Sequence, residues 1–208
     1  MRLRKLKNEK DILDNSKYII SNPKDYKGNW KKLFNNTNPI HIEIGSGKGN
    51  FILNNAINNP NINYIGIERY DSPLSRAIKK IEKTNLSNLK MVRIDAEELN
   101  DVFDKEIDII YLNFSDPWPK DRHEKRRLTH EHFLKIYDNI FINDKIIIQK
   151  TDNIKLFEYS VCSLVNYGYK LEELNLDLHK EKEEIITTEY EEKFMKLGPI
   201  YRAVYKKQ

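Results

Sequence analysis

Cysteine is almost absent from this chain, since Cys162 is the single one among 208 residues. A lone cysteine excludes an internal disulfide framework and argues against a zinc cluster built from thiolates. Because Cys162 falls within a helix-like apolar stretch, we predict a core thiol rather than a nucleophile. His123, His130 and His132 lack the cysteine or carboxylate neighbours that would complete a metal site, so we predict surface histidines and no bound metal.

Long hydrophobic runs are also missing. No apolar stretch reaches the roughly 20 residues that span a bilayer, and the first residues lack the apolar core of a secretory signal. We therefore expect a cytoplasmic protein with no membrane partner. The charge balance is equally modest, because 36 basic and 32 acidic residues leave a net charge of +4. Any nucleic-acid contact must then come from local clusters of basic residues.

Short apolar segments with strand character alternate with helix-like segments from residue 39 onward. The predicted strands are residues 40–44, 62–67, 89–94, 107–112, 145–149, 169–176 and 200–205, and the predicted helices are residues 50–58, 72–83, 129–141 and 154–166. This alternation is typical of α/β folds with a mostly parallel sheet and helices on both faces. Residues 1–38 form a basic N-terminal extension, with a helix expected near 14–21, and residues 39–208 form one domain.

A glycine-rich turn follows the first predicted strand. Three of the seven glycines in the chain stand there, at Gly45, Gly47 and Gly49. Glycine permits sharp turns and a close approach of a ligand to the backbone, so a cofactor loop is favoured over a plain connection. A P-loop does not fit, because Lys48 is followed by glycine instead of serine or threonine, and Asn50 replaces the third glycine of a dinucleotide fingerprint.

Acidic residues mark the ends of the first three strands, at Glu43, Glu68 and Asp95. A carboxylate after the second strand suits the hydroxyls of a ribose, and Asp95 would be placed to meet an adenine amino group. Each acid by itself also fits a solvated loop residue. Together they form a rim that is poorly suited to phosphates and favours a cationic adenosine ligand, such as S-adenosylmethionine.

The fourth predicted strand runs into Asp116, Pro117, Trp118 and Pro119. Each proline fixes its own φ angle and keeps the residue before it out of the right-handed helical region. We therefore expect a stiff loop that holds Asp116 and Trp118 at the carboxyl edge of the sheet, where ligands bind in open α/β folds. A carboxylate beside a flat aromatic ring suits a planar, hydrogen-bonding substrate such as a nucleobase.

Basic residues crowd the segment that follows this loop, with five Lys or Arg among residues 120–127. A run of charges is usually a solvated loop, but its place directly after a candidate catalytic loop favours contacts with RNA phosphates. The residues predicted to contact RNA are Arg122, His123, Glu124, Lys125, Arg126 and Arg127. A second basic patch, Arg2, Arg4, Lys5, Lys7 and Lys10, fits an RNA-binding arm and a solvated tail equally well.

Several of these motifs occur together in one known family. The sequence resembles the bacterial tRNA (guanine-N7-)-methyltransferases, which are class I S-adenosylmethionine-dependent enzymes, and the resemblance extends over residues 40–205. It is carried by residues 43–49, 66–68, 113–120, 125–128, 150–152 and 188–191. It implies a Rossmann-like fold, S-adenosylmethionine as cofactor, and methylation of tRNA at N7 of the variable-loop guanine, position 46.

The resemblance also implies roles for individual residues. Asp116 would be catalytic. The cofactor would be bound by Glu43, Gly45, Gly47, Glu68, Asp95 and Asp116, and the RNA substrate by Lys120, Asp152, Thr188, Glu189, Tyr190 and Glu191. Because guanine N7 carries an in-plane lone pair, no proton has to be removed before it attacks a methyl group. Asp116 would then support the charge that moves onto guanine or bind the guanine N1–H and N2–H edge, and the sequence leaves both roles open.

Other functions remain as alternatives. A methyltransferase that acts on another base or on a small molecule would share the same acids, although the basic segment favours a polyanion. A nicotinamide-dependent dehydrogenase fits the glycine spacing less well, and a non-catalytic RNA-binding module would not need the three strand-end acids. The sequence is compatible with a monomer and with a homodimer.

Overall fold

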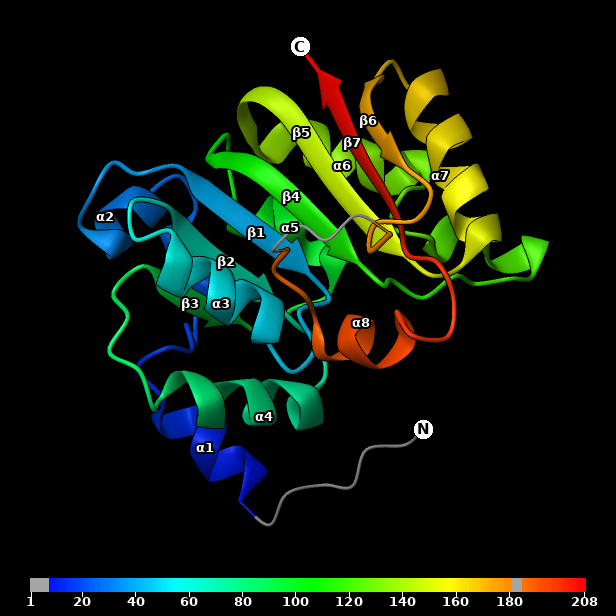
Figure 1. Cartoon of the computed structure of the whole chain (residues 1–208). Coiled ribbons are helices and arrows are strands. Elements are labelled where there is room, and N and C mark those ends of the chain that lie inside the picture. Colours follow the sequence, from blue (N-terminus) through cyan, green and yellow to red (C-terminus); the bar gives the residue numbers. More distant parts are fainter. Residues whose placement is uncertain (1–7, 181–184) are drawn as a thin grey trace.

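Seven strands form one sheet in the computed structural model, which describes residues 8–180 and 185–208. The strand order is β3-β2-β1-β4-β5-β7-β6 (Figure 1). The strands are β1 (Ile40–Ile44), β2 (Asn63–Ile67), β3 (Leu89–Val92), β4 (Ile107–Asn113), β5 (Phe141–Thr151), β6 (Lys170–Asn175) and β7 (Tyr201–Lys207). Strands β1 to β5 pair in parallel, whereas β7 is antiparallel to both β5 and β6. The predicted mostly parallel, seven-stranded α/β fold is confirmed.

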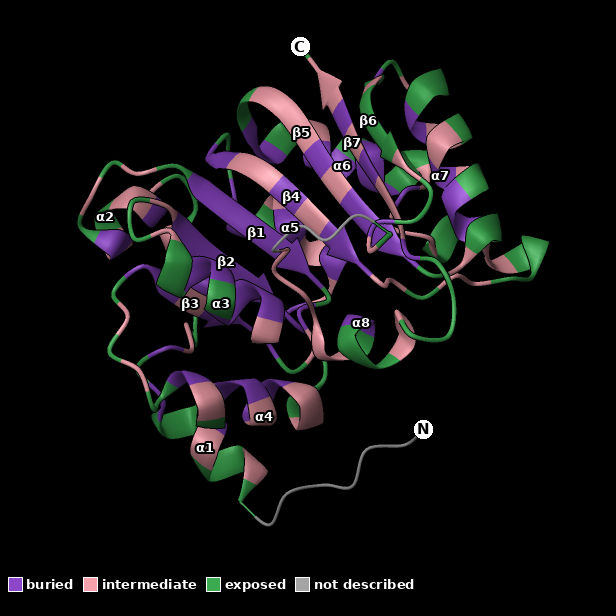
Figure 2. Cartoon of the chain, viewed as in Figure 1, coloured by how far each residue is buried: buried purple, intermediate pink, exposed green. Residues whose placement is uncertain are grey.

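Helices cover the sheet on both faces. The helices are α1 (Glu9–Asn15), α2 (Trp30–Phe34), α3 (Asn50–Asn58), α4 (Asp71–Ile81), α5 (Leu99–Val102), α6 (Glu131–Ile140), α7 (Ile154–Asn166) and α8 (Glu189–Phe194), with 3-10 turns η1 (Pro23–Tyr26), η2 (Ala96–Glu98) and η3 (Asp121–Arg126). Within β2, Tyr64 joins a core cluster with α1, α3 and α4, whereas Ile65 and Ile67 join a cluster with α2, α5, α6 and α7. Successive strand residues point to opposite faces, so the two clusters lie on opposite sides of the sheet. Figure 2 shows the buried residues concentrated along the strands between these layers. Within the described residues, every helix is too short or too polar to cross a bilayer.

The N-terminal region differs from its prediction. The helix expected near residues 14–21 is wrong, because α1 ends at Asn15 and the chain then extends along the free edge of β3. There the Ile20 N–H donates to the Met91 carbonyl at 3.0 Å, and the Met91 N–H donates to the Tyr18 carbonyl at 2.7 Å. Pairing satisfies backbone groups that an open sheet edge would leave exposed, and this gain outweighs weak local helix propensity.

Trp30, in a helix that the sequence did not predict, fastens the N-terminal region to the domain. Its side chain is fully buried, and its indole N–H donates to the Val102 carbonyl at 2.9 Å. Its backbone N–H donates to a carboxylate oxygen of Glu106, also at 2.9 Å. The described part of the predicted extension is therefore built into the main core. Arg2, Arg4, Lys5 and Lys7 lie outside the described residues.

Cys162 is exposed, so the predicted core thiol is wrong. Helix α7 buries Leu156, Phe157, Ser160 and Leu164, which lie along one face at helical spacing. Cys162 falls on another face. The apolar composition of the segment suggested that Cys162 is buried, but its position around the helix leaves it exposed.

Replacing Trp30 with alanine tests whether this region belongs to the core. Removing a fully buried tryptophan should lower the free energy of unfolding by about 3–5 kcal/mol, because a large cavity and an unpaired carbonyl remain. Urea unfolding followed by circular dichroism measures the change. Leu197→Ala is the control, since Leu197 is 76 % exposed and should be nearly neutral. A Trp30→Ala loss no larger than that of the control would contradict the packing described here.

Candidate active site at the carboxyl edge of the sheet

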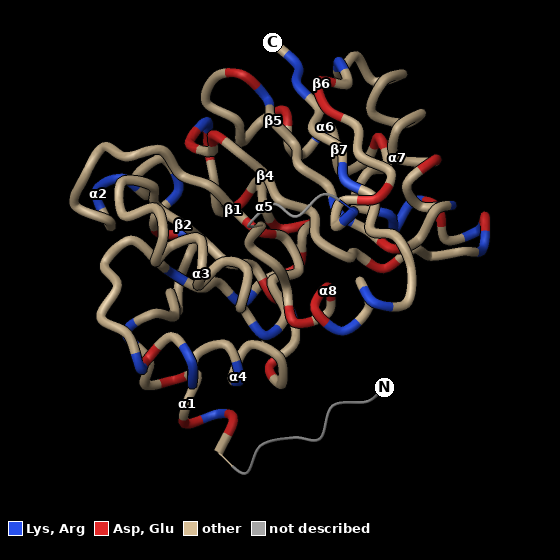
Figure 3. Tube along the Cα trace, in the orientation of Figure 1, with Lys and Arg blue, Asp and Glu red and all other residues tan. Residues whose placement is uncertain are grey.

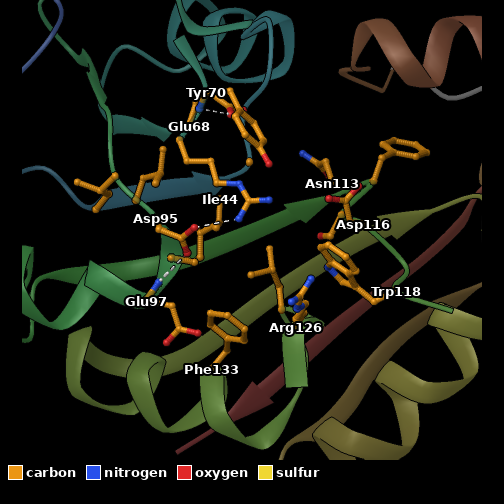
Figure 4. A pocket seen from close by; sticks show the side chains of 18 residues that line it. Ile44, Glu68, Tyr70, Asp95, Glu97, Asn113, Asp116, Trp118, Arg126 and Phe133 are labelled. Atoms are coloured by element: carbon orange, nitrogen blue, oxygen red, sulfur yellow. Dashed lines mark hydrogen bonds and ion pairs between the residues drawn. The ribbon is translucent and has the colours of Figure 1, made fainter. Parts of the chain in front are cut away.

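A cavity of about 650 Å³ opens where the parallel strands end. Figure 4 shows Glu68 and Tyr70 on one side of it, Asp95 and Glu97 on a second, and Asp116 with Trp118 on a third. Strand order reverses direction between β1 and β4, so this cavity lies at the topological switch point where α/β folds bind ligands. Three of the four predicted acids therefore meet in one pocket.

The glycine turn after β1 is shaped by backbone conformation. Gly45 has φ +80° and lines the cavity, with nothing within 4 Å of the position that a Cβ would take. Gly47, at φ +55°, donates its N–H to Glu68 at 2.9 Å, which ties the turn to the end of β2. Gly49 has a packing role, because a Cβ there would lie 2.9 Å from the Ala77 Cβ. Only Gly45 of these three borders the cavity.

Glu68 is held rigidly at the cavity wall. Its side chain is buried, and its carboxylate accepts the N–H of Gly47 and the N–H of Tyr70, each at 2.9 Å. Burial raises the pKa of Glu68, while these backbone hydrogen bonds oppose the shift by stabilising the charged form. A carboxylate has about four acceptor sites, so capacity remains for a ligand hydroxyl.

Asp95 stands at the opposite wall and caps the 3-10 turn η2 by accepting the Glu97 N–H at 3.2 Å. It also pairs with Arg69 at 2.9 Å, and the Arg69 guanidinium lies over the Tyr70 ring at 4.6 Å from its centroid. Arg69 and Tyr70 line the cavity but were not predicted as site residues. The available signal was their position directly after Glu68 at a strand end.

Glu43 does not line the cavity. Neighbouring Ile42 and Ile44 face one core cluster, so the Glu43 side chain points toward the other face of the sheet, where it is 2 % exposed. It accepts the amide N–H of Asn113 at 2.9 Å, and burial raises its pKa to about 8. Asn113 does line the cavity, so Glu43 reaches the pocket through this neighbour.

Two buried acceptors in this pair lack a partner among the described residues, namely the second carboxylate oxygen of Glu43 and the side-chain carbonyl of Asn113. Buried polar atoms are normally hydrogen-bonded, and unpaired ones mark strain or a ligand position. An unsatisfied amide oxygen on a residue that lines the cavity suits a ligand that donates hydrogen bonds. This observation agrees with the cationic adenosine ligand predicted from the acidic rim.

The loop after β4 holds Asp116 between two strained residues. Phe114 has φ +51° and Trp118 has φ +42°, a left-handed conformation that bulky residues rarely adopt. Asp116 between them is exposed and lines the cavity. Strain of this kind costs about 1–3 kcal/mol per residue and persists only where the surroundings enforce it. The predicted stiff loop is therefore stiffer than its two prolines alone would make it.

Helix α8 lies beside this loop, near the carboxyl ends of β4 and β5 (Figure 1). The Tyr190 ring contacts Phe114, with ring centroids 5.0 Å apart, and its hydroxyl donates to Asp152 at 2.9 Å. These two predicted substrate residues, Asp152 and Tyr190, are thus brought together next to the Asp116 loop. The helix was not predicted, although Thr188 and Glu191 form a capping box that is readable from the sequence.

A buried ion pair holds α8 to the sheet. Lys150, at the end of β5, donates to both carboxylate oxygens of Glu191 at 3.1 Å, and Glu191 is fully buried. His179 is 2.8 Å from the same carboxylate, and Glu189 pairs with Lys80 of α4. Burial lowers the pKa of Lys150, and Glu191 opposes that shift. Figure 3 shows acidic residues in the first turn of α8 and lysine toward its end, the arrangement that the helix dipole favours.

The predicted RNA-contacting residues divide into two groups. Lys120, Arg122 and Lys125 are exposed and form no ion pair with another described residue. Arg126 and Arg127 instead turn back toward the Asp116 loop, where the Arg126 guanidinium lies 4.9 Å from the Trp118 ring centroid. His123 meets the edge of the same ring at 5.7 Å.

Known proteins of one family are similar to this chain over most of its length. A family model described as a putative methyltransferase matches residues 37–203. The tRNA (guanine-N(7)-)-methyltransferase of Bacillus subtilis is 53 % identical over 195 residues, which is 92 % of each chain. Its counterpart in Lachnoclostridium phytofermentans is 49 % identical over 208 residues, covering 98 % of this chain and 97 % of that protein.

Solved structures show the same fold. A protein described as an antibiotic-related methyltransferase superimposes with a TM-score of 0.68 at 23 % identity, covering 88 % of this chain and 94 % of that one. The 16S rRNA methyltransferase KamB gives a TM-score of 0.66 at 13 % identity, covering 86 % and 92 %. At these identities the likeness concerns the fold. The match to the family model, with about half of all residues shared with two relatives over nearly the whole chain, shows that the chain belongs to the tRNA (guanine-N(7)-)-methyltransferase family.

Proposed function

We propose that this enzyme transfers the methyl group of S-adenosylmethionine to N7 of guanine 46, in the variable loop of tRNA, within the cytoplasm. The observation that carries the proposal is the position of Asp116. Its strained loop places a carboxylate at the wall of an acid-rimmed cavity and next to a turn of exposed basic residues. Membership of the family supports the reaction, and the geometry supports the roles given below.

The cofactor would be held by residues of the first three strand ends. Glu68 would accept the ribose hydroxyls, Asp95 would accept from the adenine amino group, and Gly45 would border the ligand. Gly47 would contribute by holding Glu68 in place. Asn113 would receive a hydrogen bond from the cationic methionine end, with Glu43 supporting it from behind. S-adenosylmethionine, when bound, supplies an electrophilic methyl group on a positively charged sulfur.

Asp116 acts by electrostatics and orientation. The lone pair of guanine N7 is free, so catalysis consists of holding the base in line with the methyl group and supporting the positive charge that develops on it. A carboxylate can accept hydrogen bonds from the N1–H and N2–H edge of guanine and favour that charge at the same time. The exposed position of Asp116 at the cavity wall suits both tasks and requires no proton abstraction.

The RNA would be bound on two sides of the loop. Lys120, Arg122 and Lys125 would contact phosphates, and Asp152 with Tyr190 would contact the nucleoside beside Phe114. Thr188, Glu189 and Glu191 would act through α8, because the first caps this helix and the two glutamates pair with lysines. His123, Glu124, Arg126 and Arg127 belong to the same basic turn and its attachment to the loop.

The full-length protein, a tRNA transcript and S-adenosylmethionine labelled in the methyl group test the proposal directly. We expect label in 7-methylguanosine, located in the variable loop by nuclease digestion and mass spectrometry. A matched transcript with adenine at position 46 should take up no label. Label in a different base, or equal label in the two transcripts, would contradict the proposed position.

Replacing Asp116 with alanine should lower kcat by about 10²-fold or more, because the reacting base loses both its orienting acceptor and its charge support. The fold should be unaffected, since Asp116 is exposed and makes no hydrogen bond with another described residue. Single-turnover methyl transfer and the thermal unfolding midpoint are the two measurements. Leu197→Ala is the control, because Leu197 is exposed and does not line the cavity. Turnover near the wild-type rate in Asp116→Ala would remove Asp116 from the mechanism.

Glu43→Gln tests the buried carboxylate through the pH dependence of stability. The folded-state pKa of Glu43, about 8, lies above its ordinary value of 4.5, so the folded protein binds this proton more tightly than the unfolded chain does. Its stabilising contribution is complete below about pH 4.5 and is lost as the pH rises through 8. Relative to Glu43→Gln, the wild type without cofactor should lose up to about 1.4 kcal/mol of unfolding free energy per pH unit in that window. Urea unfolding from pH 5 to 9 measures this difference, and parallel curves for the two proteins would exclude a buried protonated Glu43.

A further inference from the structure

Arg127 directly follows the basic turn η3 and points back at the loop that carries Asp116. Its Nε donates to the Pro117 carbonyl at 3.2 Å, and its Nη2 donates to the Trp118 carbonyl at 3.1 Å. Among residues 8–180 and 185–208, no other hydrogen bond to either carbonyl is present. The planar guanidinium therefore donates hydrogen bonds to the carbonyls of the two residues that directly follow Asp116.

Other contacts keep this guanidinium in place. Its central carbon lies 4.3 Å from the centroid of the Tyr159 ring, which belongs to α7. The backbone of Arg127 is fixed on both sides, because its N–H donates to the Glu124 carbonyl and its own carbonyl accepts the His130 N–H, each at 2.9 Å. Arg127 thus lies between the loop and helix α7, and the residue is only partly exposed.

The loop needs such a support. Trp118 has a left-handed backbone at φ +42°, a conformation that a bulky residue keeps only when its surroundings impose it. Arg126 over the Trp118 ring and His123 at its edge hold the side chain, whereas Arg127 holds the backbone. Figure 4 shows Arg126, Trp118 and Asp116 at the same side of the cavity.

We infer that Arg127 is a positioning residue for methyl transfer, one that fixes the Asp116 loop, rather than a contact to RNA phosphate. The exposed cations of the same turn, Arg122 and Lys125, remain available for phosphates. The basic turn and the Asp116 loop then form one unit. Its solvent-facing side would bind RNA, and its cavity-facing side would orient Asp116. In its catalytic consequence this inference rests on the proposed function.

Lysine in place of arginine separates the two roles. Arg127→Lys keeps the positive charge that a phosphate contact would need but loses the planar fork that reaches two carbonyls. We expect Arg127→Lys to lower kcat at saturating tRNA and cofactor by about 10- to 100-fold, because small displacements of a reacting group cost that much. The dissociation constant for tRNA should stay within about twofold of the wild type, with an unchanged salt dependence.

A second readout requires neither RNA nor activity. The chain has two tryptophans, and Trp30 is fully buried, so quenching of fluorescence by acrylamide reports on Trp118. Arg127→Lys and Arg127→Ala should each increase this quenching in the protein alone. Arg122→Ala should leave it at the wild-type level while weakening tRNA binding and flattening its salt dependence by about one phosphate contact, a slope change of about 0.7–0.9.

The outcomes are distinct. Wild-type quenching and wild-type kcat in Arg127→Lys, with Arg127→Ala losing tRNA affinity and salt dependence as Arg122→Ala does, would overturn the inference and make Arg127 a phosphate contact. If Arg127→Ala fails to fold, as circular dichroism would show, the lysine variant alone decides. If the wild-type protein transfers no label to tRNA, the proposed function fails, and the quenching comparison still decides whether Arg127 holds the loop.

Discussion

The site depends on a strained backbone conformation in the loop after β4, which the surrounding contacts have to maintain. Phe114 and Trp118 both adopt left-handed conformations without being glycine, and Asp116 stands between them. Each of these conformations costs about 1–3 kcal/mol, so the loop has to be held from outside. The Lys150 carbonyl accepts the Phe114 N–H at 2.8 Å on one side, and Arg127 holds the Pro117 and Trp118 carbonyls on the other. These contacts fix the acid in place before any substrate arrives, which is the condition for efficient electrostatic catalysis.

A buried ion pair is the second constraint, because it holds α8 beside the Asp116 loop. Lys150 belongs to β5 and Glu191 to α8, and their buried ion pair joins a strand end to a helix 41 residues later in the chain. Removing one partner of such a pair costs about 3–5 kcal/mol because the other charge is left buried alone. Tyr190 precedes Glu191 in α8 and contacts Phe114, so the interaction that holds α8 also places an aromatic ring against the Asp116 loop. Residues that resemblance assigns to the substrate can therefore act by supporting that ring.

Patterns within the sequence predicted the fold and much of the site, and the structure shows why the remainder escaped. Strand and helix alternation is a local signal, and the parallel sheet that it predicted is confirmed. The family and S-adenosylmethionine as cofactor class are confirmed as well. Glu68, Asp95 and Asp116 do meet, because carboxyl ends of parallel strands share one edge. The sequence predicted Glu43 at the same edge because it stands near the end of β1. Alternation along the strand instead turns its side chain to the face of the sheet away from Ile42 and Ile44. Arg127 looked like one charge in a basic run, and its hydrogen bonds to carbonyls ten and nine residues earlier are tertiary contacts with no sequence signature.

We propose Asp116 as the group that orients and supports guanine beside the cofactor. A crystal structure of the protein with S-adenosylhomocysteine and a tRNA fragment containing the variable loop tests this claim most directly. We predict that the Asp116 carboxylate lies within hydrogen-bond reach, about 2.6–3.2 Å, of the N1–H and N2–H edge of guanine 46, with N7 turned toward the cofactor sulfur. A guanine bound with that edge away from Asp116, or with N7 facing solvent, would contradict it.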